Sequence, residues 1–244
     1  MKDTPYKSDI ESYWGALWQS QVYGLNPCDK VTRFKFARFL KPVLDDLPRS
    51  AKLCELGSGN CQWLMLCRAY RPDIQLFGID LTSTAVAIGS NAGVCMTQAD
   101  IRDIPLPDGA FDAVYSWGVI EHVDETAQAL AEQYRLASRW VIVDVPNKCS
   151  LPALSIARDV KARGLSPYEY MVEHGKQYSP QEFRSLVQSV VHEGDDCTFM
   201  CNYHVLPHAK GLRQYLDPVV PDWLRSRLGQ NVGAVIRKGG KSRA

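Results

Sequence analysis

Five short apolar runs recur along the first two thirds of the chain, and each is followed by turn-forming or helix-starting residues. These strand candidates are residues 51–56, 74–79, 93–98, 111–117 and 139–145. Segments with helical spacing lie between them, near residues 60–70, 82–91 and 124–137, with Thr82, Ser83 and Asp124 available as N-caps. Nearly continuous apolar strands separated by helices predict a parallel sheet whose two faces are both covered.

Two later strand candidates differ from this alternation. Residues 195–206 and 231–239 have no clear crossover helix between them, so we expect them to pair antiparallel at one edge. The predicted fold class is therefore α/β, a doubly wound, mostly parallel, Rossmann-like sheet of seven strands with an antiparallel edge pair.

The length of 244 residues fits a single domain over residues 1–244. Residues 1–46, rich in aromatic and helix-forming residues, are expected to form a helical N-terminal lid. Residues 50–147 form the predicted cofactor-binding core, and residues 148–178 and 207–230 form two insertions. Ligands of such sheets bind outside the carboxyl ends of the strands, so we expect both insertions on the substrate side.

Composition limits the partners. The formal net charge of +1 gives no chain-wide basic field of the kind that dominates nucleic-acid affinity, so no nucleic-acid partner is expected. Nowhere do 18 apolar residues run together, and the N-terminus lacks a signal-peptide core, so we expect no membrane partner and a cytoplasmic location with reduced thiols. The oligomeric state stays open.

One cluster of metal-binding residue types lies in the later part of the chain. Residues 197–208 contain Cys197, Cys201, His204 and His208, which are residue types that zinc accepts. Strand alternation would place the two cysteines on one face and the two histidines on the other. We therefore expect no metal site.

The motif with the clearest chemistry is "CELGSGNCQW", residues 54–63. Gly57 and Gly59 follow the first predicted strand and open a helix, where glycine permits a tight turn and the close approach of a ligand to the backbone. A dinucleotide site would have a small residue where Gln62 stands. The carboxylate of Glu55 suits a ligand that carries an ammonium, so an amino-acid nucleoside fits better than NAD.

Two further carboxylates end the next two strands. Asp80, 25 residues beyond Glu55, can accept hydrogen bonds from ribose hydroxyls. Asp100 can accept from the exocyclic amine of an adenine while Ile101 packs on the ring. Three carboxylates at three successive strand tips indicate that the cofactor is S-adenosylmethionine.

The segments "ELGSGNC", "GID", "QADIRDIPLPDGAFDAVYSWGVIEHV" and "WVIVDVPN", in this order, resemble the class I S-adenosylmethionine-dependent methyltransferases, especially the small-molecule branch. The resemblance covers about residues 50–147, and "EHGKQYSPQEFRSLV" resembles a stretch that follows the fifth strand in many of these enzymes. It departs from the family at Cys61, which replaces the third glycine of the E-x-G-x-G-x-G motif.

The resemblance implies a cofactor role for ten residues. The methionine end would lie on Glu55, Gly57, Ser58 and Gly59, the ribose on Asp80 and Leu81, the adenine on Asp100 and Ile101, and the sulfonium near the backbone of Trp117 and Gly118.

Methyl transfer from a sulfonium is an in-line displacement, so the protein mainly positions the acceptor. A hydroxyl acceptor benefits from a general base, for which His122 and His174 are the candidates. Substrate contacts are expected from the aromatic residues Tyr13, Trp14, Trp18 and Tyr178. "SWGV" stands where base methylases carry an Asn or Asp, Pro-Pro, aromatic sequence, so we expect a small-molecule acceptor, at oxygen rather than nitrogen.

Two other functions stay open from the sequence. One is a nicotinamide-dependent oxidoreductase on a similar sheet, against which Gln62 counts. The other is a noncatalytic S-adenosylmethionine-binding protein that partners another protein.

Overall fold

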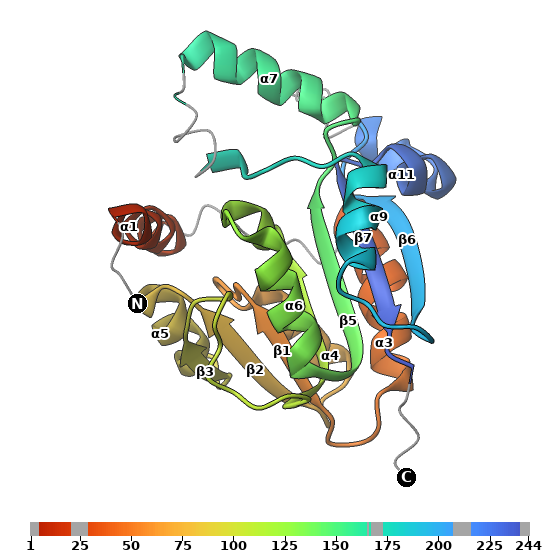
Figure 1. Cartoon of the computed structure of the whole chain (residues 1–244). Coiled ribbons are helices and arrows are strands. Elements are labelled where there is room, and N and C mark those ends of the chain that lie inside the picture. The colour runs from red at the N-terminus through yellow and green to blue at the C-terminus, as the bar shows by residue number, and fades with distance from the viewer. Residues whose placement is uncertain (1–4, 21–28, 165, 167–172, 207–215, 240–244) are drawn as a thin grey trace.

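The computed structural model describes residues 5–20, 29–164, 166, 173–206 and 216–239 (Figure 1). Its centre is a seven-stranded sheet in the order β3-β2-β1-β4-β5-β7-β6. The strands are β1 (Lys52–Leu56), β2 (Gln75–Asp80), β3 (Cys95–Gln98), β4 (Phe111–Trp117), β5 (Ala137–Pro146), β6 (Asp196–Asn202) and β7 (Asn231–Arg237). Each predicted strand is confirmed to within a few residues.

The direction of the strands also matches the prediction. The pairs β1·β2, β2·β3, β1·β4 and β4·β5 are parallel, whereas β7 is antiparallel to both β5 and β6. The chain order reverses between β1 and β4, and ligands of open α/β sheets bind at this switch point.

Helices cover both faces of this sheet (Figure 1). They are α1 (Pro5–Gln19), α2 (Lys30–Lys35), α3 (Lys41–Asp46), α4 (Gln62–Tyr70), α5 (Ser83–Asn91), α6 (Thr126–Leu136), α7 (Leu151–Arg163), α9 (Pro180–Gln188) and α11 (Asp222–Leu228). The described residues also include three short helical segments: the π-helix η1 (Phe36–Leu40) and the 3₁₀ turns η2 (Ile120–His122) and η3 (Asp217–Val219).

Capping explains where several helices begin. Thr82 caps α5 as predicted, because its hydroxyl accepts from the Ala85 N–H at 3.2 Å. The prediction was wrong for α6, where Glu125 rather than Asp124 occupies the N-cap position and no side chain caps the helix.

The core has one layer on each face of the sheet. Leu130 of α6 and Phe183 of α9 pack with the β4 and β5 residues Val114 and Val143 on one face, and all four are fully buried. On the other face, Phe39, Leu40 and Leu44 of η1 and α3 pack with Leu64 of α4. The sheet is thus fixed between two apolar layers, which leaves its strand ends for the site.

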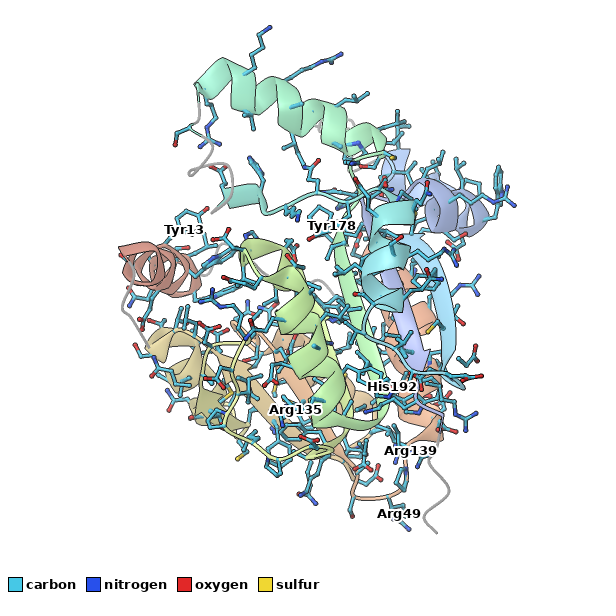
Figure 2. All side chains as sticks on the ribbon, in the orientation of Figure 1. Tyr13, Arg49, Arg135, Arg139, Tyr178 and His192 are labelled. Atoms are coloured by element: carbon cyan, nitrogen blue, oxygen red, sulfur yellow. The ribbon has the colours of Figure 1, made fainter. Side chains whose placement is uncertain are left out.

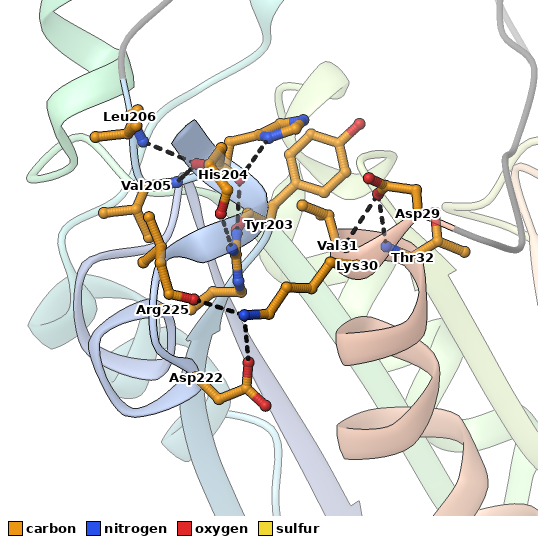
Figure 3. A network of polar contacts seen from close by, with 12 residues as sticks. Asp29, Lys30, Val31, Thr32, Tyr203, His204, Val205, Leu206, Asp222 and Arg225 are labelled. Carbon is orange, nitrogen blue, oxygen red and sulfur yellow. Dashed lines mark hydrogen bonds and ion pairs between the residues drawn. The ribbon is translucent and has the colours of Figure 1, made fainter. Parts of the chain in front are cut away.

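The N-terminal helices are tied to a distant part of the chain. The Lys30 ammonium donates to the Val220 carbonyl at 3.0 Å and lies 4.0 Å from Asp222, so α2 is held against the segment that leads into α11 (Figure 3). Asp29 caps the same helix through the N–H groups of Val31 and Thr32. No helix among the described residues is long and apolar enough to span a bilayer.

A buried charge network fixes η3 and α11 to the end of β6. Asp217 and Arg225 are 1% and 0% exposed, and their ion pair spans 2.9 Å. Asp217 also accepts from the backbone N–H groups of Val205 and Leu206 and contacts the His204 ring at 3.0 Å. Burial opposes ionisation, but His204, the Leu206 N–H and Arg225 together hold the pKa of Asp217 below its usual range.

We therefore expect Asp217→Asn to lower the free energy of unfolding by about 3–5 kcal/mol, since it leaves the Arg225 charge buried without its partner. Asp222→Asn is the matched control, because that side chain is half exposed and its ion pair is long. The control should change stability by less than about 0.5 kcal/mol. Urea denaturation of the two variants checks this, and equal losses would contradict the role given to the buried network.

Candidate functional site

The turn after β1 requires backbone conformations that favour glycine. Gly57 and Gly59 have φ values of +64° and +49°. A Cβ at Gly57 would lie 2.5 Å from the Val119 side chain, and one at Gly59 would lie 2.6 Å from the Trp18 ring. The two glycines thus allow Val119 and Trp18 to approach the loop.

Cys61, the departure from the family motif, also adopts the left-handed conformation, with φ +58° and ψ +16°, at the N-cap of α4. Its thiol is fully buried and lies 3.9 Å from the Met96 sulfur. A Cβ at Gly89 would lie 2.8 Å from the Cys61 sulfur, so that glycine makes room for the thiol. The chain keeps the glycine-like turn at a conformational cost of about 1 kcal/mol.

Asp80, at the tip of β2, fixes this loop. Its Oδ2 accepts from the Gly59 N–H at 2.9 Å, and its Oδ1 accepts from the Thr82 N–H and hydroxyl at 2.9 and 2.8 Å. The residue is 5% exposed, and burial raises the pKa of its carboxyl despite these hydrogen bonds. Since a carboxylate oxygen has two lone pairs, Oδ2 keeps capacity for one further donor.

Asp100, beyond the tip of β3, is engaged by a neighbour that sequence reasoning missed. Its Oδ1 accepts from the Arg102 backbone N–H and Nε at 3.0 Å each, and its Oδ2 accepts from Arg102 Nη2 at 2.7 Å. Arg102 also reaches Glu125 at 2.7 Å. This bidentate pair sets the orientation of the Asp100 carboxylate.

A pocket opens at this end of the sheet, between α1 and the tips of β1, β2 and β4. Its lining contains ten of the predicted residues: Trp14, Trp18, Gly57, Asp80, Leu81, Asp100, Ile101, Trp117, Gly118 and His122. Four further lining residues were not predicted: Thr82, Arg102, Val119 and Val123. The helix-cap signal of Thr82 could have indicated it, whereas nothing in the sequence distinguishes Val119 or Val123.

Helix α1 closes one side of this pocket with aromatic rings. Trp14 stacks on Trp18 with ring centroids 5.8 Å apart and meets His122 edge to face at 5.0 Å. Tyr13 packs edge to face on Trp14 but does not line the pocket. Figure 2 shows Tyr13 on α1 at the same end of the sheet as Tyr178, with Arg49 and Arg139 at the opposite end.

Three of the other predicted residues lie beneath the pocket rather than on its wall. Glu55 is 4% exposed, and burial raises the pKa of its carboxyl well above the usual range. Its Oε2 has no hydrogen-bond partner within the described residues. The Ser58 hydroxyl points back toward Gly78 of β2, where a Cβ would lie 2.8 Å from it, and Gly59 is covered by Trp18.

The structure does not bring His174 or Tyr178 to the pocket lining. Tyr178 is 6% exposed and packs in the core, where its N–H donates to the Pro146 carbonyl at 3.0 Å. His174 lies in the segment before Tyr178, with its Nε2 3.7 Å from Glu173 Oε1. Their roles in catalysis and substrate binding stay predictions.

A buried cation that was not predicted lies behind Trp117. Lys35 of α2 pairs with Asp144 of β5 at 2.8 Å, and both side chains are at most 5% exposed. The ammonium lies 3.9 Å from the centroid of the Trp117 ring and 5.7 Å from the rings of Trp63 and Tyr203. Trp117 is therefore held between this cation and the pocket.

The cysteine and histidine cluster of residues 197–208 lies only partly within the described residues. No group of three or more metal-ligand residue types comes together in the part of the chain that the structure describes. His208 lies outside that part.

Comparisons of sequence and of structure both find methyltransferases that are similar to this chain. Residues 54–139 match the family model of a methyltransferase domain. Ajmaline N-methyltransferase of Rauvolfia serpentina is 34% identical over 93 residues, which are 35% of this chain and 30% of that enzyme. The match thus spans about a third of the length of that curated relative.

Solved structures resemble the whole chain. A Thermotoga maritima methyltransferase, described as a possible histamine N-methyltransferase, has a TM-score of 0.58 at 18% identity, covering 96% of this chain and 98% of its own. Magnesium protoporphyrin IX methyltransferase of Synechocystis, solved with S-adenosylhomocysteine, has a TM-score of 0.62 at 13% identity, covering 96% and 99%. The chain has the fold of the class I S-adenosylmethionine-dependent methyltransferases, and the resemblance read from the sequence is confirmed.

The closure of α1 on the glycine loop can be tested by stability. We expect Gly164→Ala, at φ +64° with open space around it, to lose about 1–2 kcal/mol through backbone strain alone. Gly59→Ala, with similar φ, should lose about 1 kcal/mol more and change the near-ultraviolet circular dichroism, because its methyl group displaces Trp18. Equal losses with unchanged aromatic signals would contradict the contact between Trp18 and Gly59.

Proposed function

We propose that this protein is a methyltransferase that transfers the methyl group of S-adenosylmethionine to a small molecule. The observation that carries the proposal is the pocket at the switch point, where Gly57, Asp80 and Asp100 follow three neighbouring strands and line one cavity. The methyltransferase-domain match over residues 54–139 supports it.

The residues present fit this cofactor. Glu55 offers a buried carboxyl beside the Tyr115 side chain, and its Oε2 keeps acceptor capacity that suits the methionine ammonium. Asp80 keeps one acceptor position on Oδ2 for a ribose hydroxyl. Asp100, with Ile101 beside it, would take the adenine amine and ring, and the bidentate contact from Arg102 keeps its carboxylate oriented for that role.

The pocket wall also contains a residue, His122, that can remove a proton from the acceptor. When bound, the cofactor supplies an activated methyl group, so the chain has to orient the acceptor and exclude water. His122 lines the pocket beside Gly118 and is held by the Trp14 ring, so its imidazole can take a proton from a hydroxyl. We assign it as the general base for an oxygen acceptor.

The aromatic side chains of the pocket wall also indicate the chemical class of the methyl acceptor. Trp14, Trp18 and Trp117 give the pocket apolar, flat surfaces that suit a small organic molecule. Two of the similar proteins are named for ajmaline and for magnesium protoporphyrin IX, which supports a small molecule without fixing the accepting atom.

Titration calorimetry with S-adenosylmethionine, S-adenosylhomocysteine and NAD tests the cofactor. We expect the first two to bind and NAD not to bind. Asp80→Ala should weaken binding of both by about 1–3 kcal/mol, because it removes a ribose acceptor and releases the Gly59 N–H. Asp108→Ala is the control, since its side chain is 83% exposed and outside the pocket lining. Binding of NAD alone would favour the oxidoreductase.

Turnover with a labelled methyl donor and a panel of acceptors tests catalysis. We expect His122→Ala to lower kcat by about a hundredfold or more while the affinity for the cofactor stays unchanged. His192→Ala, on the surface at the opposite end of the sheet, is the matched control (Figure 2). Normal turnover of the His122 variant at saturating acceptor would remove the base assignment, and cofactor binding without any turnover would favour the noncatalytic partner protein.

A further inference from the structure

A buried carboxyl lies close to the pocket wall without lining it. Glu121 lies in η2, directly after β4, and its side chain is fully buried at 1% exposure. A methyl group added at Gly118 would lie 3.5 Å from Glu121 Oε1. Since Gly118 lines the pocket, the Glu121 carboxyl lies next to the pocket wall.

Residues 175 and 176 pack against Glu121 as well. Gly175 has φ +67°, and a Cβ there would lie 2.4 Å from Glu121 Cγ. The next residue, Lys176, donates its N–H to the Glu121 carbonyl at 2.8 Å. Glu121 Oε2 has no hydrogen-bond partner among the described residues, which is costly for a buried polar atom unless a charge lies nearby.

The surrounding charges do not supply that partner. The charged groups that act on Glu121 are Asp144 of β5 and Lys35 of α2, and these two already pair with each other at 2.8 Å. Burial raises the pKa of Glu121 well above its usual range, and Asp144 raises it further while Lys35 lowers it. A cation on the pocket side of Gly118 would stabilise the ionised carboxyl.

This inference rests on the proposed function and on the family resemblance, which implies a sulfonium near the backbone of Trp117 and Gly118. We propose that Glu121 is a specificity residue that distinguishes the charged donor from its uncharged product. S-adenosylmethionine carries a positive sulfur, and S-adenosylhomocysteine carries a neutral thioether. The Glu121 carboxylate attracts only the first through the Gly118 backbone, so its contribution to binding disappears once the methyl group has left.

Glu55 supplies a matched control within the same protein. Its buried carboxyl is assigned to the methionine ammonium, which both the donor and the product carry. Removing the Glu55 charge should therefore weaken both ligands alike, whereas removing the Glu121 charge should weaken only a ligand that carries a positive charge at the sulfur position.

The test is calorimetry of the full chain and of the variants Glu121→Gln and Glu55→Gln with three ligands. They are S-adenosylmethionine, S-adenosylhomocysteine and sinefungin, in which a charged amine replaces the methylsulfonium. We expect Glu121→Gln to weaken the first and third ligands by about tenfold or more relative to S-adenosylhomocysteine. Glu55→Gln should leave the ratio among the three ligands unchanged.

The outcomes separate the two proposals. An unchanged ratio in Glu121→Gln, with normal binding to the unaltered protein, overturns the role of Glu121 and leaves the proposed function intact. No binding of any of the three to the unaltered protein overturns both. If Glu121→Gln does not fold, Glu121→Met gives the same comparison, because an apolar side chain of similar length avoids an unpaired buried polar group.

Discussion

The hydrogen bond from the Gly59 N–H to Asp80 is the contact on which the site depends. It joins the loop after β1 to the tip of β2, and it does so with a carboxylate that is almost fully buried. A buried carboxylate must be satisfied by donors, and two of the three donors that meet Asp80 come from Thr82, the residue that caps α5. One side chain therefore fixes a turn, a helix start and the floor of the pocket at once.

The carboxyl edge of the sheet also contains several buried charged groups. On the face of α2 and α4 it buries Glu55 and Asp144, with Glu121 beside them, and Lys35 is the cation that the structure places among them. This excess of acidic groups raises the free energy of the site when no ligand is bound, and it favours the binding of a cation. A ligand with two positive centres, at its sulfur and its amino group, is the kind of molecule that such an edge accommodates.

The sequence was sufficient for the sheet because each strand is an apolar run with clear breakers at its ends. It was also sufficient for the residues at strand tips, since topology alone brings Gly57, Asp80 and Asp100 to one edge. It could not reveal Lys35 or Arg102, whose positions depend on tertiary packing and on the choice among side-chain rotamers. Nor could it reveal how Cys61 is accommodated, because the buried thiol occupies space left by Gly89, 28 residues further along the chain.

The N-terminal helices show why the site needs the whole chain. Trp18 of α1 covers the glycine loop, and Lys35 of α2 supports Trp117 from behind, so the two helices act on opposite sides of the pocket wall. Helix α2 is in turn fixed by Lys30 to the segment before α11, which the Asp217 network locks onto β6. The position of Trp117 beside the pocket is therefore linked to contacts that reach from the second helix to the last strand pair.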